Sequence, residues 1–144
     1  LAVVWGRPLE RTGVIEGQIG RNPQNRKKMA VLRRGGKFAR THYRVLDSID
    51  DSISLVECRL ETGRTHQIRV HLTSIGHSIV GDSVYGGVRK LSAATSQVIR
   101  DQLASVTTQS LHARSLGFKH PITNEMLQLI SPKTSENFKL FDRP

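Results

Sequence analysis

Cysteine, aromatic residues and long apolar runs are all scarce in this chain of 144 residues. Cys58 is the only cysteine, which excludes an internal disulfide or a cysteine-built zinc site and indicates a reducing, cytoplasmic compartment. The longest stretches without Asp, Glu, Lys or Arg, Val70–Gly81 and Gln102–Ala113, have twelve residues each. A membrane-spanning helix needs about 20, so none is expected. No signal peptide is visible and the chain begins at Leu1, so we expect a processed or truncated N-terminus.

Acidic residues are absent between Glu16 and Asp47, and this gap holds nearly all of the net charge of +10. The basic residues within it are Arg21, Arg26, Lys27, Lys28, Arg33, Arg34, Lys37, Arg40 and Arg44. Charge concentrated in one segment predicts contact with phosphates, and hence a nucleic acid partner. Because aromatic residues make up only 5% of the chain, folded RNA or DNA contacted through its backbone fits better than a platform for stacking single strands.

Two other interpretations of this segment remain open. Its basic residues would also suit a solvated hairpin, although solubility is usually served by charges of both signs. An anionic membrane surface is less well supported, because the segment alternates like strands and has no amphipathic helix with large apolar anchors.

Apolar runs and alternation predict strands in the first half of the chain, at Ala2–Trp5, Val14–Ile19, Lys28–Leu32, Phe38–Leu46 and Ile53–Leu60. Lys28–Leu32 and Phe38–Leu46 resemble a hairpin around Gly35 and Gly36. The strand at Ile53–Leu60 should pair with Val45 and its neighbours. Closely spaced strands of this kind favour an antiparallel sheet.

After Gly63 the apolar spacing becomes helical. Ile68, Leu72 and Ile75 predict a buried helix face, with Thr65 as its cap and Gly76 as its end. Further along, we expect a modest surface helix within Leu91–Val106, closing strands at Leu111–Phe118 and Met126–Ile130, and a short helix at Phe138–Phe141. The prediction is one α+β domain over residues 1–144, with a mostly antiparallel or mixed sheet and one well-marked helix.

The turn before that helix holds the strongest candidates for binding an anion. Helix N-termini bind anions, and Arg64, Thr65 and Gln67 would add side-chain donors there. Arg69 lies close to the buried edge, where a charge without a partner is costly. No carboxylate partner is obvious in the chain, since Asp82 lies in a turn where it would organise backbone N–H groups.

The string LETGRTHQIRVHL at Leu60–Leu72, followed by GHSIVGDSVYGG from Gly76, resembles the signature of the RluA-type RNA pseudouridine synthases. Within that family it is most similar to the D group, which modifies the large ribosomal RNA. Gly20–Val31, Ala39–Leu46, Leu111–Ala113 and Phe118–Pro121 extend the resemblance in collinear order. It covers most of residues 1–130.

The resemblance implies an enzyme that converts uridine to pseudouridine in large-subunit ribosomal RNA, with no cofactor and no metal. A flipped uridine would meet an Asp paired with an Arg and flanked by a Tyr. By motif position that Arg is Arg69. The expected RNA-binding residues are Arg21, Arg26, Lys27, Lys28, Arg33, Arg34, Lys37, Arg40, Arg64, Thr65, His66 and Gln67.

Two parts of the implied site are missing from this sequence. The family's nucleophile lies in an upstream His-Arg-Leu-Asp motif, which does not occur here, and its Tyr would fall just before Leu1. We therefore expect the C-terminal portion of a catalytic domain, inactive alone, with Arg69 facing an empty or solvent-filled site. A sheet without its preceding strands should expose an edge or an apolar face, with self-association or local disorder near Leu1–Arg11 unless those residues fold back.

The alternative function is a non-catalytic module that binds a ribosomal stem-loop by charge and shape. A metal site is poorly supported, because His66 and His71 are five residues apart and point about 140° apart on a helix. Cys58 alternates with Val56 and Leu60 and is expected in the core. Trp5 is also expected there. Tyr85 is expected to be structural, with support of the site wall as the alternative role.

Overall fold

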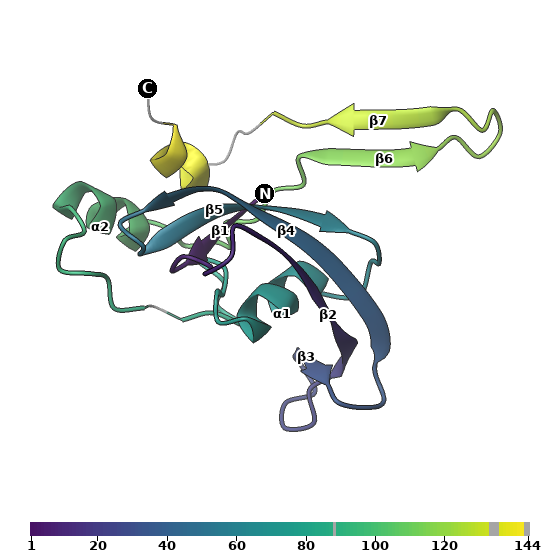
Figure 1. Cartoon of the computed structure of the whole chain (residues 1–144), viewed down its shortest axis with the longest axis horizontal. Helices are drawn as coiled ribbons and strands as arrows, with labels where there is room; N and C mark the ends of the chain where they lie inside the picture. The colour runs from purple at the N-terminus through teal and green to yellow at the C-terminus, as the bar shows by residue number, and fades with distance from the viewer. Residues whose placement is uncertain (88, 133–135, 143–144) are drawn as a thin grey trace.

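The computed structural model describes residues 1–87, 89–132 and 136–142. Five strands form an antiparallel sheet that curves over helix α1 (Figure 1). Their order is β1-β5-β4-β2-β3, with bounds β1 Ala2–Trp5, β2 Thr12–Arg21, β3 Met29–Leu32, β4 Lys37–Ile49 and β5 Ile53–Leu60. The predicted α+β class with a mostly antiparallel sheet is confirmed. No helix in the described ranges combines the length and the apolar character needed to cross a membrane.

Strand β2 lies between β3 and β4, so the predicted hairpin of Lys28–Leu32 with Phe38–Leu46 is wrong. Gly20 in β2 pairs with Ala30 in β3, while Gly17 in β2 pairs with Ala39 in β4. Gly36 packs on the backbone of β2, where a Cβ would lie 2.8 Å from the carbonyl carbon of Gln18. Gly35 and Gly36 therefore carry the chain from β3 to β4 across β2 at Gln18 and Ile19.

Strands β4 and β5 pair as the sequence predicts, with Val45 opposite Val56. The register shifts between Val45 and Asp47, which makes a β-bulge. Asp50 and Asp51 join the two strands with φ angles of 49° and 52°. Two successive residues of positive φ are what a type I′ hairpin turn requires.

Helix α1 (Gln67–Ser74) packs through Val70 against Ile19 and Ala39 of the sheet. Leu72 is buried as predicted, but Ile75 is exposed because it lies beyond the last helical residue. Gly76 follows with a φ of 85° and ends the helix, as expected.

A second layer covers the other end of the sheet. Helix α2 (Gln97–Ala104), capped by the Ser96 hydroxyl, and a 3-10 helix (Glu136–Phe141) confirm the two helices expected there. Leu103 and Phe138 from these elements join Trp5 and Ile53 in one buried cluster, which confirms Trp5 as a core residue.

Residues Leu1–Trp5 are buried and Ala2–Trp5 pair with β5, so this part of Leu1–Arg11 folds back on the sheet, which was the alternative to local disorder. The amide of Val3 donates to the carbonyl of Ser110, and the amide of Val80 donates to the carbonyl of Val3. These contacts cover the edge of β1 that does not pair with β5.

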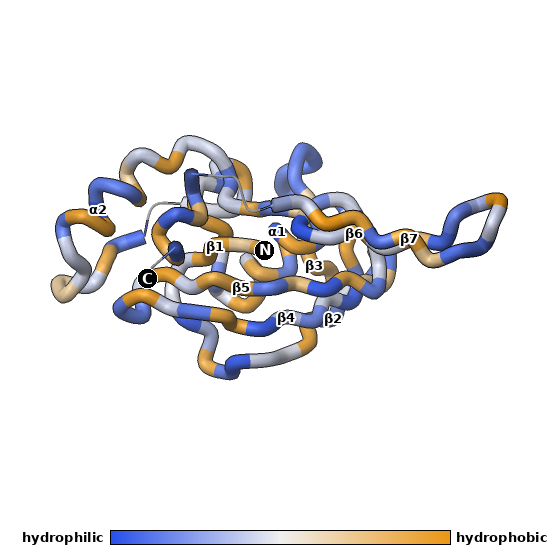
Figure 2. Tube along the Cα trace, turned by 90° about the horizontal axis from the view of Figure 1, so that it is seen from above, coloured by the Kyte–Doolittle hydropathy of each residue, from blue (hydrophilic) through white to orange (hydrophobic). Residues whose placement is uncertain are grey.

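The apolar face that the sequence leads us to expect lies instead on a projecting hairpin of β6 (Ser115–Lys119) and β7 (Met126–Ile130) (Figure 1). Leu116 pairs with Leu129, and Phe118 pairs with Leu127, so one face carries four apolar side chains. Leu116 and Leu129 are 59% and 58% exposed. Figure 2 shows hydrophobic colouring along both strands. We call these four residues the hairpin face.

Candidate functional site

Gln67 builds the turn between β5 and α1 from inside the protein. Its Oε1 accepts from the Thr62 hydroxyl at 2.8 Å and from the Arg64 amide at 2.9 Å. Its Nε2 donates to the Arg40 carbonyl and to the Thr41 hydroxyl, each at 3.0 Å. Because the residue is only 3% exposed, its expected role as a donor to RNA is wrong.

His66, and not Thr65, is the N-cap residue of α1. His66 has a φ of 57°, in the left-handed region, and its side chain makes no capping hydrogen bond. The imidazole turns instead toward Tyr85, whose hydroxyl lies 2.7 Å from Nδ1. Partial burial and the nearby Arg69 lower the pKa of His66, so the ring is neutral near pH 7.

Arg69 has a carboxylate partner within the chain, which corrects the expectation that the chain supplies none. Its Nε donates to Asp82 Oδ2 at 2.8 Å, and its Nη2 donates to Oδ1 at 3.0 Å. The Asp82 side chain is fully buried and that of Arg69 is 14% exposed. Such a bidentate pair fixes the orientation of the guanidinium as well as its position.

Asp82 also organises its own turn, as the sequence predicts. Oδ1 accepts from the amides of Val84 at 3.0 Å and Tyr85 at 3.1 Å. Burial alone would raise the pKa of the Asp82 carboxyl, but the hydrogen bonds from Arg69 and from the two amides lower it below its usual value. The pKa of Arg69 is raised by the same pair, so both groups remain charged near neutral pH.

Tyr85 lies at the centre of the site, although sequence reasoning assigned it mainly a structural role. The centroid of its ring lies 4.9 Å from Arg69 Cζ, within the range of a cation–π contact. Its hydroxyl accepts from the Met29 amide at 2.8 Å. The only sequence signal for a role of Tyr85 was its position three residues after Asp82 in a Gly-Asp turn. That position does not indicate that the tyrosine contacts β3.

One edge of the Arg69 guanidinium remains available for another group. Asp82 occupies Nε and Nη2, and within the described part of the chain no hydrogen bond reaches Nη1. An arginine held in this way can present its remaining N–H groups to a second anion, either a carboxylate or a phosphate.

Exposed cations of the basic segment approach this site where the chain after β2 comes close to His66 and Tyr85. The loop Asn22–Lys28 between β2 and β3, here called the basic loop, carries Arg26, Lys27 and Lys28. Arg21 precedes it and is close enough to influence the pKa of His66. Arg33, Arg34 and Lys37 are exposed between or near β3 and β4, and Thr65 is exposed beside α1. Arg64 is half-buried, with Nε donating to the Phe38 carbonyl at 2.9 Å.

Arg40 does not belong with these cations. Its guanidinium pairs with Glu16 and Glu61, so its charge is neutralised locally. Its strand neighbours Ala39 and Thr41 face α1, so Arg40 points to the opposite face of the sheet. Its expected role in RNA binding therefore does not fit this geometry.

The remaining candidate groups are inside the protein. His71 is fully buried, with Nδ1 2.8 Å from the Thr41 hydroxyl, and lies apart from His66. Cys58 packs against the core cluster of Val56 and Leu72 as predicted, and burial raises the pKa of its thiol to about 11. A thiol that is protonated near neutral pH is a poor nucleophile.

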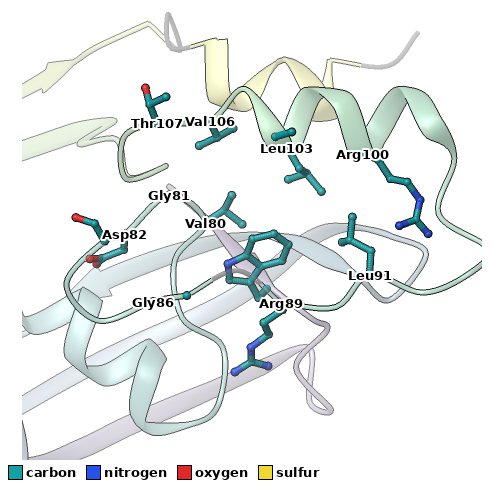
Figure 3. A pocket seen from close by; sticks show the side chains of 14 residues that line it. Val80, Gly81, Asp82, Gly86, Arg89, Leu91, Arg100, Leu103, Val106 and Thr107 are labelled. Carbon is teal, nitrogen blue, oxygen red and sulfur yellow. The ribbon is translucent and has the colours of Figure 1, made fainter.

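A cavity of about 540 Å³ adjoins the Asp82 turn and reaches α2 (Figure 3). Trp5, Val80 and Leu103 give it an apolar wall, and Arg89 lies at its edge. Neither Arg69 nor Tyr85 lines it. The cavity therefore shares Asp82 with the charged site but does not include the Arg69 guanidinium.

Substituting Asp82→Asn should destabilise the chain by on the order of 3 kcal/mol near neutral pH, because it leaves the buried side of Arg69 without a counter-charge. The pKa of Asp82 is lower in the folded state, so the contribution of the pair is complete above about pH 4 and is lost as the pH falls through the folded-state pKa. Urea unfolding at a series of pH values should show the difference between wild type and Asp82→Asn shrinking below about pH 4.

Asp51→Asn is the matched control, because Asp51 pairs with Arg7 at an exposed site. It should change the free energy of unfolding by less than about 1 kcal/mol. A difference between wild type and Asp82→Asn that stays constant down to about pH 3 would show that ionised Asp82 does not stabilise the fold.

The sequence of this chain is similar to those of known proteins. A family model described as RNA pseudouridylate synthase matches residues 1–74, just over half of the chain. The "Ribosomal large subunit pseudouridine synthase D" of Nitrosomonas europaea is 48% identical over 132 residues, which are 92% of this chain and 36% of that protein. The protein of the same name from Zymomonas mobilis is 46% identical over 127 residues, or 88% of this chain and 38% of that protein.

A solved structure of a protein with a pseudouridylate synthase domain is also similar to this chain. "Human RNA Pseudouridylate Synthase Domain Containing 1" superposes with a TM-score of 0.72 at 28% identity, over 92% of this chain and 52% of that chain. The chain spans well under half the length of the two bacterial relatives. The chain belongs to the RNA pseudouridylate synthase family, as its RluA-type signature indicated.

Proposed function

We propose that this chain is the C-terminal portion of a catalytic domain that converts uridine to pseudouridine in large-subunit ribosomal RNA. The observation that carries the proposal is the Arg69 guanidinium, which Asp82 fixes on one edge and which is open on the other. The names of the bacterial relatives, which specify the large ribosomal subunit, support this substrate. The proposal includes a cytoplasmic location, where bacterial ribosomal RNA resides.

In this reaction the bond from C1′ to N1 of uridine breaks and a bond from C1′ to C5 forms. The C5 proton leaves to solvent, and N1 takes up a proton. Arg69 would hold an Asp supplied by the upstream part of the domain, through the edge that Asp82 leaves free. A neighbouring guanidinium keeps such a carboxylate ionised and oriented. Since the chain has no His-Arg-Leu-Asp motif, it should be inactive alone.

The decisive experiment uses a chimera in which this chain replaces the matched region of the Nitrosomonas europaea protein. We expect the chimera to release tritium from 5-tritiated uridine in large-subunit ribosomal RNA, and this chain alone to release none. Arg69→Ala in the chimera should lower the rate on the order of 10²-fold or more, because a preorganised charge at the reacting groups is lost.

Arg44→Ala is the control in the chimera, because Arg44 pairs with Glu57 on the exposed sheet face. It should leave the rate unchanged. Tritium release by this chain alone would overturn the assignment of the nucleophile. A chimera that binds the RNA but stays silent would favour the non-catalytic RNA-binding module.

RNA contact through the basic loop predicts a defined salt dependence. Removing two phosphate contacts with Arg26→Ala and Lys27→Ala together should reduce the slope of log affinity against log salt by roughly 1.5. The double variant Arg44→Ala, Arg59→Ala removes the same charge from side chains paired with Glu57. Binding to large-subunit ribosomal RNA, measured over a range of salt concentrations, should separate the two variants. Equal slopes would show that net charge, and not the loop, determines affinity.

We also propose that the hairpin face mediates self-association of this chain. Four apolar side chains on a projecting two-stranded hairpin form a surface that a second copy can cover. Sedimentation equilibrium should give a mass that rises with concentration in wild type and stays monomeric in Leu129→Lys. Leu9→Lys is the control, because Leu9 is 95% exposed outside the hairpin. A monomeric wild type at all concentrations would refute the proposal.

A further inference from the structure

The hydroxyl of Tyr85 joins two parts of the molecule that are far apart in sequence. The Met29 amide donates to it at 2.8 Å, and His66 Nδ1 lies 2.7 Å away. The low pKa of His66 leaves its ring neutral near pH 7, so Nδ1 can accept the hydroxyl proton. The hydroxyl therefore bridges the first residue of β3 and the N-cap residue of α1.

The basic loop is ordered by its own hydrogen bonds. Asn22 Oδ1 accepts from the amides of Gln24 and Asn25, and Asn25 Oδ1 accepts from the amide of Lys27. The Asn22 amide donates to the Lys28 carbonyl at 2.9 Å and closes the loop. A loop tied in this way should move together with the strand residue that follows it, whose amide contacts the tyrosine hydroxyl.

The other end of the connection is Arg69. The Tyr85 ring lies 4.9 Å from Arg69 Cζ, and the Tyr85 amide donates to Asp82, the partner of Arg69. The loop and the ion pair each have their own hydrogen bonds, so neither needs the Tyr85 hydroxyl for its local structure. The hydroxyl is a hydrogen-bonded link between the two, in addition to the packing of Met29 and Tyr85 against the cluster around Val70.

We propose that Tyr85 is a positioning residue that couples the basic loop to the Arg69–Asp82 pair, so that RNA phosphates held by the loop set the position of that pair within the site. The inference rests on the proposed function, because it takes RNA as the ligand of the loop. It adds that binding at the loop is transmitted to the reacting groups through one side chain.

Tyr85→Phe removes both hydrogen bonds of the hydroxyl and keeps the ring beside Arg69. Tyr43→Phe is the matched control, since Tyr43 is the only other tyrosine and packs on Gly13 in the sheet. In this chain labelled with ¹⁵N-arginine, a short RNA hairpin should shift the Arg69 Nε–H resonance of wild type and of Tyr43→Phe. Tyr85→Phe should bind the same RNA within about two-fold of wild type but leave that resonance unmoved.

The chimera provides a second readout. Tyr85→Phe should lower kcat by roughly 10-fold or more through a misplaced guanidinium, with KM within about three-fold of the unsubstituted chimera. If the RNA hairpin binds wild type and the resonance moves equally in Tyr85→Phe, this inference falls and the proposed function stands. If the RNA does not bind wild type at all, the proposed function loses its partner and the inference falls with it.

Discussion

The ion pair between Arg69 and Asp82 is the interaction on which the site depends. A fully buried carboxylate is tolerated here because four donors reach it: two N–H groups of Arg69 and the amides of Val84 and Tyr85. The pair locks α1 to the Gly-Asp turn, and the turn in turn places the Tyr85 ring beside Arg69. Removing either charge would leave the other buried without compensation.

The strands could be predicted from sequence because alternation and short turns are local signals. The pairing of β2 with β3 could not, because two glycines beside a strand fit a tight hairpin as well as a close crossing over another strand. The backbone of β2 at Gln18 decides between them by packing against Gly36. That contact joins segments distant in sequence, so no local pattern contains it.

The candidate site was predicted in part. The motif and the helical position identified Arg69, but its partner Asp82 was set aside because one role, organising a turn, already explained that residue. A carboxylate has two oxygens and can accept from both a guanidinium and a turn. Gln67 and Arg40 were misassigned because residue type alone does not distinguish a donor facing solvent from one already satisfied inside the protein.

The contacts of Gln67 and Arg40 remove two residues from the surface that could bind an RNA phosphate. With Arg40 neutralised by Glu16 and Glu61, the exposed cations that approach the site are Arg21 and those of the basic loop, which precedes the Met29 amide bound to Tyr85. Arg69 lies beside them but is fixed by Asp82, so it can discriminate by geometry while the exposed cations attract by charge. Long-range attraction and accurate orientation need different side chains, because exposed charges are screened and mobile whereas a buried pair is neither. The fold separates these two tasks, and Tyr85 contacts both Arg69 and the residue that follows the basic loop.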